Sequence, residues 1–128
     1  MISCNKNSFK KIDILNKEGG DIMKTIQKLQ YITEDIRKSY DIPHLYSRVE
    51  ALHAAEIKEI IKQLNFIKSY IDIEYKFTDI PRSMSKFREL LICLIMDTQD
   101  LYKNVLNKND GLIKKYNSYI FETLISIN

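Results

Sequence analysis

The two histidines, His44 and His53, are the side chains best suited to acid–base chemistry near neutral pH. His53 lies between Glu50 and Glu56, so three possible metal ligands would follow one side of a helix. Di-iron helical bundles use a Glu-x-x-His motif on each of two helices, with further glutamates from the other two. Only one such motif occurs here. We therefore interpret His53 as a boundary histidine flanked by solvated carboxylates, and we predict no metal site and no cofactor.

Arg37 and His44 form a second candidate for chemistry, because they stand seven residues apart. This spacing is similar to that of the Arg and His pairs in some helical ribonucleases, but a proline turn at 41–43 falls between them. Cys93 lies in an apolar run and is predicted to be a buried, unreactive thiol. No Gly-rich phosphate loop, Cys-x-x-Cys pair or nucleophile elbow occurs. The chain therefore does not read as an enzyme, and a metal-dependent or ribonuclease-type helical enzyme is the weaker alternative.

The charge of the chain gives little reason to expect nucleic acid as its ligand. Lysine and arginine total 20 against 17 acidic residues, a formal net charge of +3. Base recognition relies heavily on arginine, which is scarce here, and no short recognition helix can be found. A nucleic-acid-binding regulatory protein is the alternative function. The sequence shows no membrane span, and its two cysteines fit no structural disulfide, so we predict a cytoplasmic protein that does not bind membranes.

Apolar residues recur at steps of three and four along four segments, which predicts four helices at 21–40, 43–77, 81–106 and 111–125. The second would be about 50 Å long, and its apolar positions include Leu52 and change phase near 54–55. Short connections make neighbouring helices antiparallel. The chain therefore predicts an all-α fold, an antiparallel four-helix bundle with one long second helix, as a single domain over 21–128.

Residues 1–20 are predicted to form a short N-terminal arm, poorly ordered or helical, with Phe9, Ile12 and Leu15 on one face. The codons for 17–20 can also spell a ribosome-binding sequence just before Met23. The native chain therefore starts either at Met1 or at Met23, and the arm belongs to it only in the first case.

The tripeptide Asp-Ile-Pro occurs twice, at 41–43 and 79–81, and each copy should end one helix and begin the next. Proline is tolerated in the first turn of a helix, and Asp41 or Asp79 should accept hydrogen bonds from the free amides there. The two segments are either copies of one helical unit or two similar answers to the need for a tight, capped turn.

The run 90–96 is apolar on every side of its helix, so it must be covered from several directions, by the rest of the chain or by a second copy. Eight tyrosines and no tryptophan occur, and tyrosine suits protein interfaces. We therefore predict a non-enzymatic module that binds a partner protein or itself through an apolar helix face. The candidate contact residues are Tyr70, Tyr75, Tyr102, Tyr116 and Tyr119. By analogy of fold, adaptors, chaperones and inhibitor or immunity-type proteins of bacteria and phages have this size.

Overall fold

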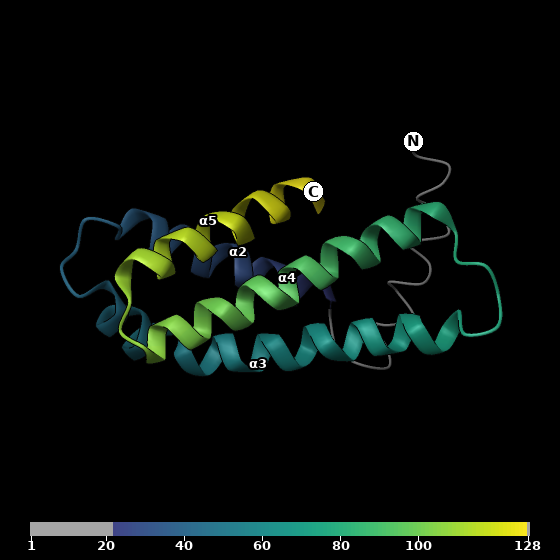
Figure 1. The fold of residues 1–128 in the computed structure, drawn as a ribbon, viewed down its shortest axis with the longest axis horizontal. Coiled ribbons are helices and arrows are strands. Elements are labelled where there is room, and N and C mark those ends of the chain that lie inside the picture. The colour runs from purple at the N-terminus through teal and green to yellow at the C-terminus, as the bar shows by residue number, and fades with distance from the viewer. Residues whose placement is uncertain (1–21, 128) are drawn as a thin grey trace.

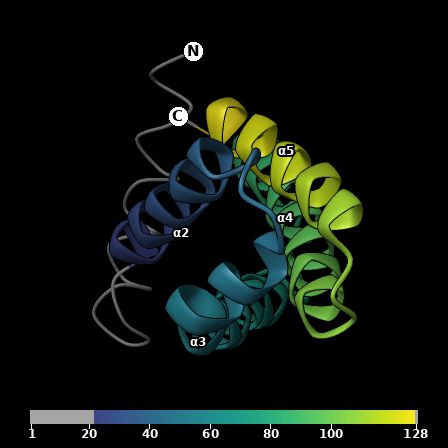
Figure 2. The same cartoon turned by 90° about the vertical axis from the view of Figure 1, so that its left-hand side faces the viewer.

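The computed structural model describes residues 22–127, which form four α-helices joined by short connections (Figure 1). The helices are α2 (Ile22–Lys38), α3 (Leu45–Glu74), α4 (Arg82–Leu106) and α5 (Asp110–Ile127). Seen end-on, they surround one core, with α2 packed against α3 and α5, and α4 packed against the same two helices (Figure 2). The predicted all-α, four-helix bundle with a long second helix is confirmed. The predicted arm at 1–20 lies outside the described residues.

The core is built from the apolar positions that recur at helical spacing. In α4 the residues at steps of three and four are buried, with Phe87 partly buried against the core: Met84, Phe87, Leu91, Leu94, Thr98, Leu101 and Val105. In α2 the corresponding residues are also buried, namely Ile22, Ile26, Leu29, Thr33 and Ile36, and Tyr40 packs against the core from just beyond the helix. In α5 the polar Asn117 is fully buried, which the apolar pattern did not predict.

Within α3, the predicted core position Leu52 is wrong. Leu52 is exposed and His53 is buried in its place, because buried positions continue at steps of four from Val49 through His53 to Ile57. The change of phase predicted near 54–55 therefore does not occur. One polar residue, His53, sits in an otherwise apolar stripe, and treating it as a surface residue shifted the predicted register.

The apolar run 90–96 is also less enclosed than predicted. Leu91, Leu94 and Ile95 are buried, but Met96 is 58% exposed and Cys93 is exposed as well. The prediction of a buried Cys93 thiol is therefore wrong. Among the described helices, α4 packs against α3 and α5 and not against α2, so one side of it faces away from the core they share.

The aspartates of the two Asp-Ile-Pro turns do not cap the following helices, contrary to prediction. Asp41 and Asp79 are exposed, and neither His44 nor Pro81, the N-cap residues of α3 and α4, makes a side-chain cap hydrogen bond. His44 adopts a left-handed conformation with φ 57°, whereas Pro81 has φ −57°. The two turns therefore start their helices through different local conformations.

A distant residue caps α3 instead. The Asp110 carboxylate, in the first turn of α5, accepts hydrogen bonds from the backbone amides of Leu45 at 3.0 Å and Tyr46 at 2.8 Å. Free amides at a helix N-terminus favour a negative charge, so this carboxylate satisfies two of them directly. It also ties the α2–α3 connection to the α4–α5 turn. We call this end of the bundle the closed end.

The opposite end is formed by α3 and α4 without the other two described helices (Figure 1). Thr25, in the first turn of α2, donates to Gln63 at 2.7 Å, so the remaining residues of α3 extend past α2. At 18 residues α5 is shorter than α4, which has 25, and it stops before reaching the start of α4. Residues 66–89, which we call the hairpin extension, therefore project beyond α2 and α5.

Candidate functional site

The five predicted contact tyrosines fall into two separate groups. Tyr70 lies on the last turns of α3 and Tyr75 is its C-cap residue, so both belong to the hairpin extension. Tyr102 lies near the other end of α4, roughly 30 Å along that helix from its start. Tyr116 and Tyr119 lie on α5, with ring centroids 5.9 Å apart, and Lys115 sits over both rings. The structure therefore does not bring the five together into one surface.

Four of these tyrosines are partly buried against the core, and only Tyr119 is counted among the exposed side chains. Large apolar residues near the first group are much more exposed. Phe66 is 44% exposed, Ile73 is 74% exposed and Phe77 is 89% exposed. Phe66, Tyr70 and Ile73 occupy positions i, i+4 and i+7, which share one side of α3, and Phe77 follows in the turn after the C-cap residue Tyr75. We call these four residues the α3 stripe.

The α3 stripe was missed at the sequence level, although its spacing was visible there. Its members lie beside the buried stripe of α3, which contains Leu64, Ile67 and Ile71. A helix in a small bundle buries only one of its faces. A second apolar line on the same helix therefore indicates apolar side chains that are exposed to solvent.

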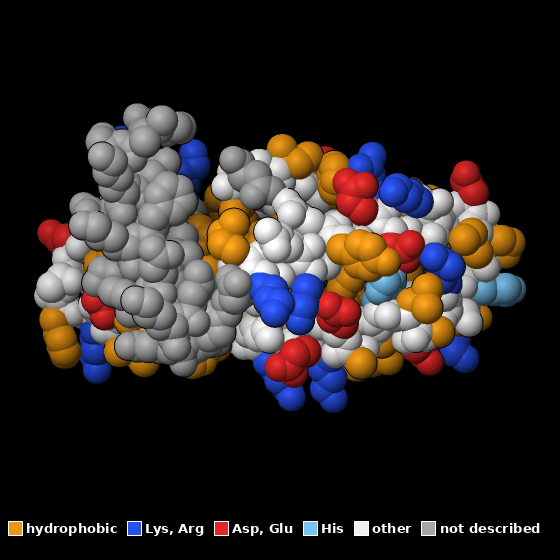
Figure 3. Space-filling model, turned by 180° about the vertical axis from the view of Figure 1, so that it is seen from behind, with side chains coloured by type: hydrophobic (Ala, Val, Ile, Leu, Met, Phe, Trp, Pro, Cys, Tyr) orange, Lys and Arg blue, Asp and Glu red, His pale blue; other side chains and the backbone are white. Residues whose placement is uncertain are grey.

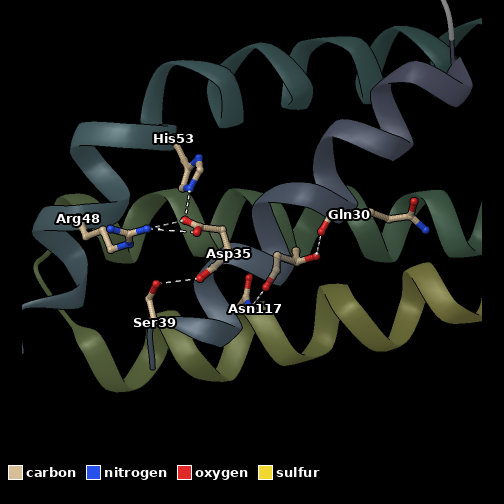
Figure 4. Close-up of polar contacts among 7 residues, drawn as sticks. Gln30, Asp35, Ser39, Arg48, His53 and Asn117 are labelled. Carbon is tan, nitrogen blue, oxygen red and sulfur yellow. Dashed lines mark hydrogen bonds and ion pairs between the residues drawn. The ribbon is translucent and has the colours of Figure 1, made fainter. Parts of the chain in front are cut away.

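A polar cluster joins α2 to α3 near the closed end (Figure 4). His53 Nε2 lies 2.7 Å from Asp35 Oδ2, and Arg48 Nη2 lies 3.2 Å from Asp35 Oδ1. His53 and Arg48 both project from α3 toward the Asp35 carboxylate on α2. The hydroxyl of Ser39 donates to the Asp35 backbone carbonyl at 2.9 Å.

The hydrogen bond with His53 is the largest influence that holds the pKa of Asp35 below its usual range, and the bond and charge of Arg48 add to it. Burial of the carboxylate acts in the opposite direction and raises the pKa. The net effect is an Asp35 that prefers to stay ionised. The cluster is therefore a charged connection between two helices, and Asp35 carried no signal in the sequence because it lies on a different helix from His53.

The residues of the Glu-x-x-His-x-x-Glu motif, Glu50, His53 and Glu56, do not converge on one point. Glu50 and Glu56 are exposed, and His53 contacts Asp35 instead of either of them. Among the described residues, no group of three or more His, Cys, Asp or Glu side chains converges as metal ligands would.

Arg37 and His44 are likewise engaged separately. The Arg37 guanidinium lies 4.1 Å from the centroid of the Phe121 ring on α5. His44 is exposed, and its ring meets that of Tyr46 edge-on with centroids 5.7 Å apart. The two residues of the ribonuclease-like spacing thus have different partners.

A shallow groove of about 430 Å³ lies between α2 and α5. Its lining includes Tyr31, Phe121 and Ile125, and Ile125 is 60% exposed. Over the face seen in Figure 3, acidic and basic side chains are interspersed, with hydrophobic groups between them. The exposed apolar residues of this groove come from two helices, α2 and α5, whereas those of the α3 stripe come from α3 and the turn that follows it.

None of the four described helices combines the length and the hydrophobicity that a membrane span requires. Comparison with known proteins adds no relative: no family model matches the chain, and no similar curated protein or solved structure was found.

Proposed function

We propose that this protein is a helical interaction module that binds a partner protein through the α3 stripe. The observation that carries the proposal is the exposure of Ile73 and Phe77, at 74% and 89%, on a part of the bundle that projects beyond α2 and α5. Exposed apolar residues that share one face are typical of protein interaction sites. Tyr70 lies within the stripe, so part of the tyrosine prediction belongs to this surface.

Other features support the same proposal. The polar side chains of the closed end are used within the bundle: Asp35 contacts His53 and Arg48, and Asp110 caps α3. The proposed role is therefore that of an adaptor, chaperone or inhibitor, in which recognition depends on buried apolar area. We place the protein in the cytoplasm, because an exposed free thiol such as Cys93 suits a reducing compartment.

The test uses two isoleucines that are both exposed but lie on different surfaces. Tagged wild-type protein, Ile73→Asp and Ile125→Asp are purified from the native host, and the mass of each complex is measured by light scattering. We expect one protein in fixed stoichiometry with wild type and Ile125→Asp, and its loss in Ile73→Asp. Both substitutions replace exposed side chains, so each should change the folding free energy by less than about 0.5 kcal/mol.

The reverse pattern would contradict the proposal. Retention of the partner by Ile73→Asp and its loss in Ile125→Asp would transfer the function to the α2–α5 groove. Nucleic acid in the purified complex, released steeply as salt rises, would favour the alternative function of a nucleic-acid-binding regulator.

A further inference from the structure

We propose that residues 1–21 pack against the inner side of the hairpin extension, which we define by its buried residues Ile67, Ile71 and Met84. The α3 stripe is a different surface, because Ile73 and Phe77 keep exposed fractions of 74% and 89% in the same chain. The inference therefore goes beyond the proposed function and does not depend on it.

The inner side is buried more completely than two helices explain. Ile71 is 2% exposed and Met84 is 1% exposed, close to the value of 0% for Leu101, which lies where four helices meet. A fully buried core residue typically touches about 6–12 other residues. Beside Ile71 and Met84, however, the described helices are α3 and α4 alone (Figure 1). A further segment must therefore contribute contacts on this side.

The connection between α3 and α4 accounts for only part of this cover. Tyr75 and Ile80 pack against the core there, four residues after Ile71 and four residues before Met84. Neighbours at this spacing cover a side chain along the helix axis, and the facing helix covers one flank. The other flank, toward α2, needs a third segment. Since these exposed fractions are those of one chain alone, the segment belongs to this chain and not to a partner.

The chain enters α2 beside this surface. Thr25 donates to Gln63 at 2.7 Å, so the start of α2 lies next to the part of α3 that leads into Ile67. Ile22, the first residue of α2, is only 1% exposed, although the end of a helix lacks a preceding turn to cover it. From this point the end of α3 is roughly 12 Å away, whereas 21 residues span about 30 Å even in a helical conformation. Residues 1–21 are therefore long enough to cover the whole inner side.

The sequence of residues 1–21 supplies the side chains that such packing requires. Phe9, Ile12 and Leu15 recur at steps of three, and Gly19 and Gly20 stand just before α2. Burial of large apolar side chains is the main favourable term in packing. Glycine adopts backbone conformations that other residues avoid, so the pair allows the chain to change direction before it enters α2.

The native cysteines allow the contact to be tested in the full chain with the core left intact. A nitroxide label is attached to Cys4 in a Cys93→Ser variant, and the paramagnetic loss of amide NMR signals is mapped. Cys93 is exposed, so its replacement should leave the fold unchanged. We expect residues 67–71 and 84–87 to lose most of their signal intensity, while residues around Leu45 and Leu101 at the closed end keep theirs.

Variants within residues 1–21 test whether the apolar side chains make the contact. Phe9→Asp with Ile12→Asp should restore the lost signals, because a charge packed against apolar side chains is costly. The matched control, Asn7→Asp with Asn16→Asp, adds two negative charges at polar positions and should keep the loss.

Several results would overturn the inference. Signal loss around Tyr31 and Ile125 would place residues 1–21 in the α2–α5 groove instead. Unchanged signals throughout the protein, or an equal loss in the Phe9→Asp, Ile12→Asp variant, would refute the packing. Loss that transfers to unlabelled chains in a mixed sample would make a second copy the source of the cover. None of these results bears on the α3 stripe, whose test is the retention of a partner by Ile73→Asp.

Discussion

At the closed end of the bundle four helices meet, and their polar groups are used by one another. Asp110 caps α3, Asp35 holds His53 and Arg48, and Asn117 donates to the Thr33 carbonyl and to the Tyr40 hydroxyl. At the hairpin extension only α3 and α4 continue among the described helices, and Phe66, Ile73 and Phe77 stay exposed.

This difference distinguishes residues that stabilise the fold from residues that we propose bind a partner. Where four helices pack, apolar faces are buried and the side chains of Asp35, His53 and Asp110 find partners, so these residues stabilise the fold. Where α3 and α4 extend further, the exposed residues of the α3 stripe lie beyond the described parts of α2 and α5. The contrast predicts that substitutions at the closed end and in the core change stability, whereas those on the α3 stripe change binding.

The largest effect should come from placing a charge in the core of α4. Leu94 is fully buried and Met96, two residues later, is 58% exposed. Leu94→Asp buries a charge without a partner and should unfold the domain, because that cost exceeds a typical stability of about 5–15 kcal/mol. Met96→Asp is the matched control and should stay folded. A cooperative thermal transition of Leu94→Asp by circular dichroism would show that this face of α4 is not the core.

The next effect tests the long-range cap at the closed end. Asp110→Ala leaves the Leu45 and Tyr46 amides without their acceptor and should destabilise the protein by about 1–3 kcal/mol. Asp41→Ala, at the position first expected to cap α3, should cost less than about 0.5 kcal/mol because Asp41 is exposed. Urea denaturation measures both, and equal losses would mean that Asp110 is not the cap.

Acid sensitivity should also differ between the two regions. The folded-state pKa of Asp35 is lowered by its hydrogen bonds with His53 and Arg48, so its stabilising contribution is complete above the unfolded pKa of about 4. It is lost as the pH falls through the lower folded value. Asp35→Asn should therefore remove part of the acid dependence of the folding free energy below the unfolded pKa of about 4.

Asp72 provides the comparison on the hairpin extension. Its pKa is lowered by Arg88 and Lys68, with the same sign, but its side chain is more exposed than that of Asp35, at 38% against 22%. Solvent screens exposed pairs more effectively. Asp72→Asn should accordingly change the acid dependence of the folding free energy less than Asp35→Asn does. Denaturation at several pH values measures both variants. A larger change for Asp72→Asn would contradict the stronger ion pairing assigned to the closed end.

The smallest effect is expected at the turn of the hairpin extension. Pro81 is the N-cap residue of α4 and makes no side-chain cap hydrogen bond. Proline has no backbone N–H, so no hydrogen bond donated by this residue is lost on substitution. Pro81→Ala should cost at most about 1 kcal/mol, chiefly by loosening the unfolded chain. A larger loss in melting temperature would mean that the conformation of this turn contributes more to stability than the exposure of its residues indicates.

Much of the fold could be predicted because apolar spacing follows the helical period over long segments. The stripe Met84, Leu91, Leu94 and Val105 shows this for α4. What failed depended on contacts between distant residues. Asp110 caps a helix that begins 65 residues earlier. Asp35, on another helix, is the hydrogen-bond partner of His53, which is buried where the apolar pattern had predicted Leu52. Local patterns cannot reveal such pairs.

The candidate site was predicted only in part for a related reason. Tyrosine composition indicated an interface but not where it lies, and the five chosen residues belong to two ends of the molecule. Tyr70 belongs to the α3 stripe, whereas Phe66, Ile73 and Phe77 were not predicted, because their exposure depends on how far the described part of α2 runs along α3. Exposure of an apolar residue depends on where neighbouring helices stop, which the periodicity of one helix does not contain.

The most direct test of the central claim is amide hydrogen exchange on the complex that copurifies from the native host, compared with exchange on the protein alone. The account predicts new protection concentrated in residues 66–77, with exchange near Tyr102, Tyr116 and Tyr119 unchanged. Protection confined to α5 and the second half of α4, with 66–77 exchanging as in the free protein, would contradict the assignment of the α3 stripe as the binding surface.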